Sequence, residues 1–256
     1  MGTHPKSPSR LLTTDATLSS YLASHPDLIG KSVLEKFKDE GMQQGNLPFL
    51  FKLLSIEKAL SIQTHPDKKT AEALHKSLPG IYKGIPKGIL IRRLFSLKSS
   101  DPNHKPEMAL AITSFQALCG FRPLPEIASY LNNTPELKAL IPPSILTTFL
   151  SLADSNPEGQ EEKSSLKNVF ASLMTAPDEE VKKQLDALLK RYASDIIQED
   201  DKEVANLVVR LSSQFPGDVG IFCAFMLNYV KLEPSQAIFL GAGEPHAYVS
   251  GGMHLP

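Results

Sequence analysis

Short apolar runs separated by prolines and polar clusters dominate residues 46–113. They read LPFLFKLLSI, KALSIQTH and MALAIT, and FQALCGF follows directly. Runs of this length that are rich in Leu, Ile and Phe suit strands better than helices, although periodicity alone does not decide between the two. We therefore predict a β region over this part of the chain.

After Pro123 the apolar positions follow the period of a helix. In the segment after Pro177, Asp178, Glu179 and Glu180 occupy the expected first turn, where the helix dipole favours negative charge. The apolar residues that follow recur at steps of three and four, which places them on one helical face. They are Val181, Leu185, Leu188, Leu189, Tyr192 and Ile196.

Residues 166–173 and 204–211 repeat this helical spacing. VGIFCAFMLNYV, which begins at Val219, is apolar nearly all round and is typical of a buried helix. We therefore expect a helical domain over residues 124–232. SQAIFLG and HAYV return to strand-like runs, so residues 1–123 and 233–256 are expected to belong to one sheet system.

Composition narrows the class of protein. The 256 residues are 41% hydrophobic, which suits a globular fold. The formal charge of −1 gives no global attraction to nucleic acid or to an anionic membrane, and neither is expected as a partner. The start, MGTHPKSPSR, lacks the apolar core of a signal peptide, and no apolar run is long enough to span a bilayer. Cys119 and Cys223 are far apart, which argues against a disulfide scaffold and a thiolate zinc site, so we expect a cytoplasmic protein.

Four residues are candidates for a metal site. Gln63 and His65 are two positions apart, so on a strand both side chains would project from the same face. Glu107 adds a carboxylate and His246, in EPHAY, adds a second imidazole, which together make a plausible zinc site with room for water or substrate. Each residue alone is more often an ordinary surface or hydrogen-bonded side chain, the interpretation that we give to His25, His75 and His254.

The chain resembles the type I mannose-6-phosphate isomerases. The resemblance rests on seven sequence words in the same order: MGTHP, NLPFLFKLLS, LSIQTHPDK, NHKPEMALAIT, FQALCGFRP, FPGDVGIF and EPHAYVSG. It implies an α+β protein, a cupin-type β-sandwich or jelly roll interrupted by the helical domain. Carried over position by position, the zinc ligands of the family fall on Gln63, His65, Glu107 and His246.

This resemblance implies an enzyme that interconverts mannose 6-phosphate and fructose 6-phosphate through a cis-enediol, with zinc as a Lewis acid. The product feeds GDP-mannose biosynthesis and protein glycosylation, and we expect a monomer that binds a hexose 6-phosphate. His104 and Lys105 are candidates for catalysis, Lys105 being the better one, and Lys52 for substrate binding. The alternatives are an ordinary exposed lysine at 105 and a snorkelling strand residue at 52.

The ends of the chain depart from the family pattern. Met1 begins inside a family word, and beyond Gly251 the family continues into strands that carry a catalytic arginine and into a second cupin domain, whereas this chain ends at Pro256. Loss of one charge-stabilising group typically lowers a rate by about 10²- to 10³-fold. We therefore expect an incomplete cupin, and the alternative function is a shortened isoform that binds metal or hexose phosphate without turnover.

The segment GIPKGILIRRLFSLKSS, residues 84–100, is an insertion relative to the family and lies ahead of Glu107. It carries four basic residues and no acidic residue. The simplest interpretation is a basic surface hairpin or amphipathic turn, and docking to a membrane or nucleic acid is a second. A third hypothesis is an unspliced intron or an imperfect gene model, which would also account for the final GMHLP.

Overall fold

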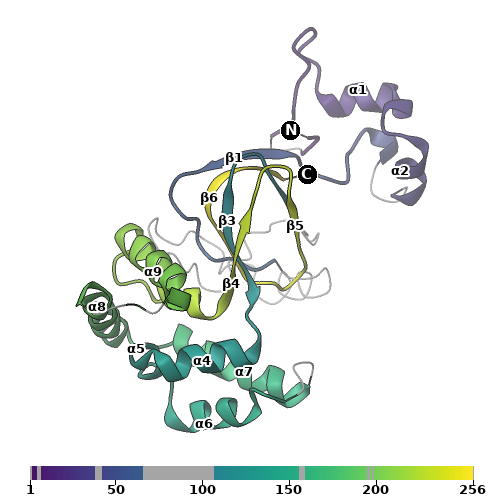
Figure 1. Cartoon of the computed structure of the whole chain (residues 1–256). Helices are drawn as coiled ribbons and strands as arrows, with labels where there is room; N and C mark the ends of the chain where they lie inside the picture. Colours follow the sequence, from purple (N-terminus) through teal and green to yellow (C-terminus); the bar gives the residue numbers. More distant parts are fainter. Residues whose placement is uncertain are drawn as a thin grey trace.

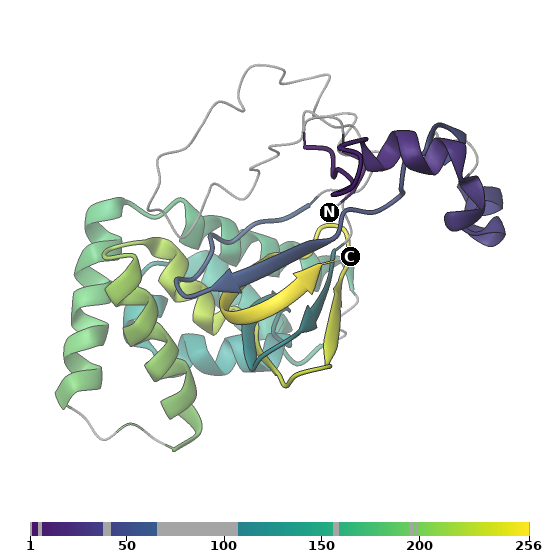
Figure 2. The same ribbon diagram turned by 90° about the horizontal axis from the view of Figure 1, so that it is seen from above.

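The computed structural model describes residues 2–4, 7–37, 42–65, 107–155, 159–194, 197 and 199–255. A curled antiparallel sheet lies at its centre. Helices of the middle of the chain pack on one side of the sheet, and a small helical arm from the N-terminal part projects from the other (Figures 1 and 2). Segments 107–121 and 227–255 are thus brought side by side across the intervening helices, as the sequence predicts.

Six strands within the described residues form the sheet, in the order β4-β3-β6-β2-β5, with β1 also paired to β6. All pairings are antiparallel. The strands are β1 (Lys52–Ile56), β2 (Glu107–Ala111), β3 (Phe115–Phe121), β4 (Leu227–Leu232), β5 (Ala237–Leu240) and β6 (His246–Leu255). Strands at 52–56, 107–111, 115–121, 237–240 and 246–255 confirm the β regions predicted from the short apolar runs. The prediction is wrong for KALSIQTH, residues 58–65, which forms no strand and pairs with β6 through an isolated bridge at Gln63.

Strand β6 is shared by two parts of the sheet. Its residues 246–250 pair with β3, whereas residues 251–255 pair with β1 and, in part, with β2. Residues 252–255, the part of GMHLP that the structure describes, therefore lie within a paired strand, and Met253 is fully buried. The inner face of the curled sheet is lined by Ile56, Ala109, Ala111, Phe115, Ala117, Cys119, Leu240, Tyr248 and Met253.

The helical part contains the helices that the spacing of apolar residues predicts. Its elements are α4 (Leu124–Asn133), α5 (Pro135–Lys138), α6 (Pro143–Leu152), α7 (Gln160–Met174), α8 (Asp178–Ser194), η4 (Glu199–Asp201), α9 (Lys202–Gln214) and η5 (Val219–Phe225). The predicted apolar face of α8 is confirmed by the burial of Val181, Leu185 and Leu188. One continuous apolar cluster joins these helices to the sheet through residues such as Leu118, Ala247 and Val249.

The interpretation of VGIFCAFMLNYV as one buried helix is wrong for its second half. The segment forms a short 3-10 helix, η5, and then enters strand β4, which pairs with β3. Residues 220–225 are all buried, so the segment is apolar on every side and shows no period. Period is the signal that separates helix from strand, and without it the sequence cannot decide between them.

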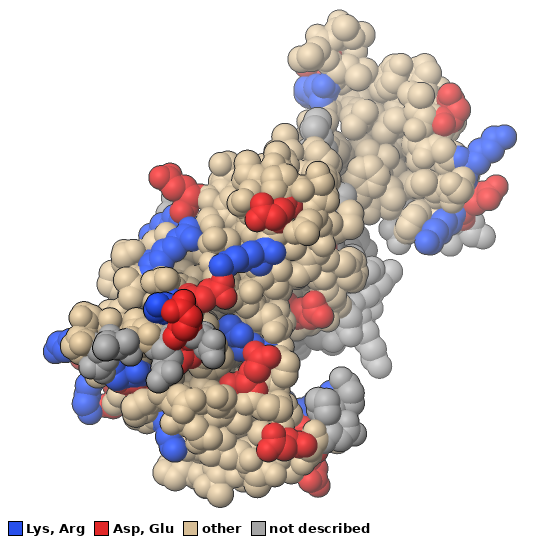
Figure 3. All heavy atoms as spheres, viewed as in Figure 1, with Lys and Arg blue, Asp and Glu red and all other residues tan. Residues whose placement is uncertain are grey.

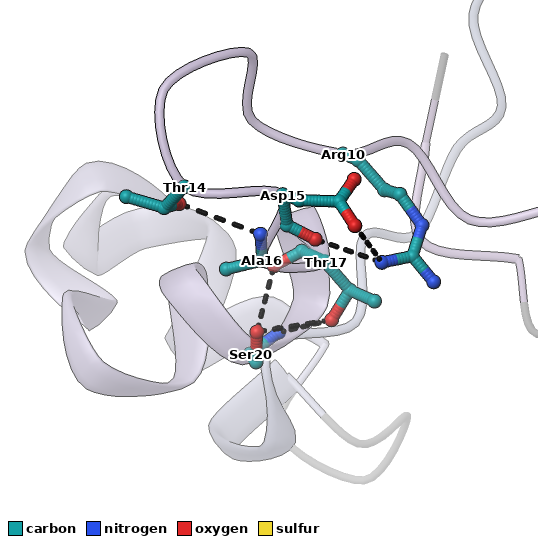
Figure 4. A network of polar contacts seen from close by, with 6 residues as sticks. All are labelled: Arg10, Thr14, Asp15, Ala16, Thr17 and Ser20. Atoms are coloured by element: carbon teal, nitrogen blue, oxygen red, sulfur yellow. Dashed lines mark hydrogen bonds and ion pairs between the residues drawn. The ribbon is translucent and has the colours of Figure 1, made fainter.

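The N-terminal arm contains α1 (Leu18–Ser24), η1 (Pro26–Leu28), α2 (Lys31–Lys36) and η3 (Met42–Gln44). A network of polar contacts fixes the entry into α1 (Figure 4). Arg10 donates to the main-chain and side-chain oxygens of Asp15, at 2.7 and 3.3 Å, and Ser20 N–H donates to the capping hydroxyl of Thr17. Few apolar side chains of the arm are buried, so local hydrogen bonds account for much of its order.

Charged side chains of both signs are interspersed on the face shown in Figure 3, particularly over the helical part. No helix within the described ranges is both long enough and apolar enough to cross a lipid bilayer. The basic segment 84–100 lies outside the described residues, so its interpretation stays a prediction.

Candidate metal centre

Three segments that are distant in sequence bring His65, Glu107 and His246 together. Glu107 begins β2 and His246 begins β6, while His65 lies on the segment that follows β1. That segment is tied to β6 by two main-chain hydrogen bonds of 2.9 Å between Gln63 and His246. The pairing of an irregular segment with the start of β6 is what places the two imidazoles side by side, with ring centroids 5.5 Å apart.

The ligand atoms of these residues are close enough to share one ion. His65 Nε2 lies 3.3 Å from Glu107 Oε1, and His246 Nε2 lies 3.7 Å from Glu107 Oε2. All the candidate ligand atoms lie within 4.8 Å of one another. In a tetrahedral zinc site with bonds of about 2.0–2.2 Å, neighbouring ligand atoms are about 3.3–3.5 Å apart. The group is therefore nearly at the spacing of a zinc site.

Two buried nitrogen atoms support this interpretation. Nε2 of His65 and Nε2 of His246 are inaccessible to solvent, and neither has a hydrogen-bond partner within the described residues. Buried polar atoms are normally hydrogen-bonded, because leaving them without a partner costs about 1–3 kcal/mol. A metal ion between them and Glu107 would satisfy both nitrogens.

The tautomer of His246 is fixed by the main chain. Its Nδ1 lies 3.0 Å from the carbonyl oxygen of Glu244, which can only accept, so Nδ1 carries the hydrogen. Nε2 of the neutral ring then holds a free lone pair directed at Glu107. Burial is the main cause that lowers the pKa of His246, which keeps the ring neutral and able to bind a metal.

Glu107 is held ionised. Burial raises its pKa, but the side chain of His65, 3.3 Å away, and a hydrogen bond from Tyr248 outweigh burial and lower the pKa to about 2. At neutral pH the carboxylate is thus ready to bind a cation.

The sequence did not predict two contacts that hold Glu107 and His65 in place. Tyr248 O–H donates to Glu107 Oε2 at 2.5 Å, and burial and the Glu107 charge raise the pKa of Tyr248, so the phenol remains a donor. In the loop of residues 241–245, Gly243 N–H donates to His65 O at 2.8 Å. The only sequence signal for Tyr248 is its position two residues after His246, which places both on one face of β6.

The remaining candidates lie elsewhere or outside the described residues. Gln63 is half-buried beside the group and bridges to His246 through its main chain, while the role of its side chain as a ligand stays a prediction. Lys52 is exposed on β1 and pairs with Leu255, nine positions along β6 from His246. The structure thus does not bring Lys52 to the three ligands. His104 and Lys105 lie outside the described residues.

Histidines outside the group have other surroundings. His25 stacks on Tyr21 in the N-terminal arm, with ring centroids 4.3 Å apart. His254 is half-buried against the ring of Phe51. His75 lies outside the described residues.

The sequence matches two family models. Residues 1–89 and 95–124 match the catalytic domain of phosphomannose isomerase type I, and residues 143–227 match the helical insertion domain of the same family. The chain belongs to the type I phosphomannose isomerase family. The second match covers helices α6 to α9 and η5, which interrupt the sheet in the sequence.

Relatives with this family name are similar over nearly the whole chain. The mannose-6-phosphate isomerase of Cryptococcus neoformans var. neoformans serotype D is 44% identical in an alignment of 269 positions that covers 99% of this chain and 57% of the relative. The human mannose-6-phosphate isomerase is 40% identical in an alignment of 256 positions that covers 98% of this chain and 55% of the relative. The chain thus spans little more than half the length of these relatives.

Solved structures of the family share the fold. A zinc-bound mannose 6-phosphate isomerase covers the whole chain with a TM-score of 0.72 at 31% identity, and 58% of that structure is matched. The apo form of the enzyme from Salmonella typhimurium gives the same TM-score and identity, with 57% of that structure matched. The predicted α+β class, a cupin-type sheet with inserted helices, is confirmed.

Proposed function

We propose that this phosphomannose isomerase chain binds zinc through His65, Glu107 and His246, with Gln63 as a fourth ligand, and interconverts mannose 6-phosphate and fructose 6-phosphate. The observation that carries the proposal is the pair of buried Nε2 atoms without hydrogen-bond partners beside an ionised carboxylate. Family membership and the zinc-bound relative support it.

The residues of the chain would have separate roles in metal binding and in proton transfer. Zinc, when bound, supplies Lewis acidity toward the sugar oxygens at C1 and C2. His65 and His246 offer neutral nitrogen ligands, and Glu107 contributes the negative charge that offsets the cation. The Glu244 carbonyl keeps His246 in the tautomer that leaves Nε2 free. Moving the proton between C1 and C2 through a cis-enediol needs a titratable side chain, for which Lys105 and His104 are our candidates.

The alternative is a chain that binds metal or hexose phosphate without turnover. The three ligands found together in the structure suffice for binding, whereas isomerisation also needs the proton carrier and groups that stabilise charge. Binding and turnover must therefore be measured separately.

The test combines metal analysis with a coupled isomerisation assay on the purified, zinc-loaded chain. We expect one zinc per chain and activity in the wild type, and loss of both in Glu107→Gln. Glu179→Gln, at an exposed position of α8, is the matched control and should keep both. Stoichiometric zinc without turnover would favour the alternative. A wild-type chain that binds no zinc would contradict the proposed zinc-dependent isomerase, and one that binds neither zinc nor hexose phosphate would contradict both functions.

We propose a cytoplasmic monomer that supplies activated mannose for GDP-mannose biosynthesis and protein glycosylation. We also propose the division into residues 1–123, 124–232 and 233–256, in which the helical part would contribute β4 to the sheet.

A further inference from the structure

Tyr248 contacts the carboxylate of the metal group from inside the sheet. Its hydroxyl donates to Glu107 Oε2 at 2.5 Å, and its side chain is 1% exposed. The ring packs against Phe115, with centroids 5.6 Å apart, and Tyr248 pairs with Ala117 of β3. The phenol is therefore enclosed and cannot reach a substrate, so any role in the site passes through Glu107.

The two oxygens of Glu107 have different surroundings. Oε1 lies 3.3 Å from His65 Nε2, at about the spacing expected for neighbouring zinc ligands. Oε2 lies 3.7 Å from His246 Nε2 and receives the short hydrogen bond from Tyr248. This hydrogen bond occupies one of the two lone pairs of Oε2 and fixes the rotation of the carboxylate, whereas Oε1 accepts no hydrogen bond from the described residues.

We propose that Tyr248 is a positioning residue that directs Oε1 of Glu107 to the metal and keeps Glu107 a one-oxygen ligand. The inference rests on the proposed metal site and deepens it. A carboxylate that binds through both oxygens would fill an additional position around the ion. Held through one oxygen, it leaves that position for water or for a sugar oxygen, as in catalytic zinc sites.

The chain contains a matched control in the same sheet, on a strand separated from β6 by β3. Tyr229 of β4 is a partly buried tyrosine whose hydroxyl donates to Gln116 Oε1 at 2.7 Å. Tyr229→Phe removes a hydrogen bond of the same kind from the same sheet without touching a metal ligand. It separates an effect on the metal from a general loss of stability.

The experiment measures zinc affinity by competition with a chromophoric chelator and the visible spectrum of the Co²⁺-substituted chain. For Tyr248→Phe we expect zinc affinity to fall about 10- to 100-fold. The Co²⁺ absorption should weaken as the coordination number rises, while Tyr229→Phe should match the wild type in both. Unchanged affinity and spectrum in Tyr248→Phe would overturn the inference.

A measurement on the wild type covers the case in which the variant folds poorly. In a crystal structure of the zinc-loaded chain, we expect Oε1 on the metal and Oε2 on Tyr248, and both oxygens on the metal would refute the proposal. His246→Ala tests the underlying site. If it binds zinc as tightly as the wild type does, the metal site itself is wrong, and the positioning role falls with it.

Discussion

Gly251 lies where β6 changes partners. Residues before it pair with β3, and Gly251 itself begins the pairing with β1. Its φ is +108°, and a Cβ at this position would lie 2.4 Å from Ser114 O and 2.8 Å from the Cα of Phe115. Glycine is therefore required here for two reasons: the backbone conformation is one that other residues rarely adopt, and there is no space for a Cβ atom.

We predict that Gly251→Ala lowers the free energy of unfolding by about 3 kcal/mol or more, because backbone strain and a steric clash add. Gly30→Ala is the control. Gly30 has a φ of +89° and nothing within 4 Å of the added Cβ, so strain alone should cost about 1–2 kcal/mol. Urea unfolding of both variants measures the difference, and equal losses would contradict the prediction.

The sequence identified the candidate metal ligands but not the residue that hydrogen-bonds to one of them. The spacing of QxH and the family words selected His65, Glu107 and His246, which the structure brings together. Tyr248 lies in the word EPHAYVSG, but neither the spacing nor the family words assign it a role, and its hydrogen bond to Glu107, 141 positions away, is visible only in the structure. Only the pairing of the strands shows that the two side chains meet.

Helices α5 and α8 are joined by one ion pair. Arg191 Nε and Nη2 donate to the two carboxylate oxygens of Glu136 at 2.9 and 2.8 Å, and Glu136 is buried. Burial raises the pKa of Glu136, but the hydrogen bonds and charge of Arg191 outweigh it, so the pKa lies below its usual range. The ionised pair therefore stabilises the folded chain.

We predict that Glu136→Gln lowers the free energy of unfolding by about 1–3 kcal/mol at pH 7, because the two charged hydrogen bonds between Arg191 and Glu136 are replaced by weaker ones. A carboxyl whose pKa is lowered by folding stabilises above its unfolded pKa, and this contribution is lost as pH falls through the folded pKa. The difference between variant and wild type should thus shrink on acidification, as followed by urea unfolding at several pH values.

Glu179→Gln on α8 serves as the comparison. Glu179 contacts Lys182 at 3.1 Å but is 90% exposed, so its loss should change stability by less than about 0.5 kcal/mol. A pH-independent effect of Glu136→Gln would show that packing, and not the ion pair, accounts for the change.

Among the elements, the period of apolar residues predicted the helices that bury only one face. α7, α8 and α9 have one apolar face each, and their sequences show it. The turn from η5 into β4 carries no such signal, since all of its first part is buried. Residues Leu227–Leu232 form a strand because they pair with β3, which lies more than a hundred residues earlier in the sequence.

The helical part and the sheet share one core. Leu118, Ala247 and Val249 of the sheet belong to the same apolar cluster as the helices. Polar contacts reinforce the junction, because Gln116 Oε1 on β3 accepts hydrogen bonds from side chains of α9, β4 and β6. The donors are Arg210, Tyr229 and Ser250, at 2.9, 2.7 and 3.1 Å.

We therefore predict a single cooperative unfolding transition for the helices and the sheet of the metal-free chain. Ellipticity at 222 nm reports mainly on the helices. The near-ultraviolet signal of the tyrosines reports on tertiary packing in both parts, since Tyr130 and Tyr192 lie on helices and Tyr229 and Tyr248 on strands. The two thermal curves should coincide. Separate midpoints would mean that the shared core does not couple the two parts.

Because His246 lies on β6, the group of His65, Glu107 and His246 can assemble during protein synthesis only after β6 has been made and has paired with the earlier strands. A ribosome makes His65 and Glu107 first, then helices α4 to α9, and only then His246 and Tyr248. A nascent chain that has not yet reached β6 offers one imidazole and a carboxylate with no phenol to orient it. In the proposed site, metal loading would thus be a late event of biogenesis, and the metal content of a chain would report whether β6 has paired with the earlier strands.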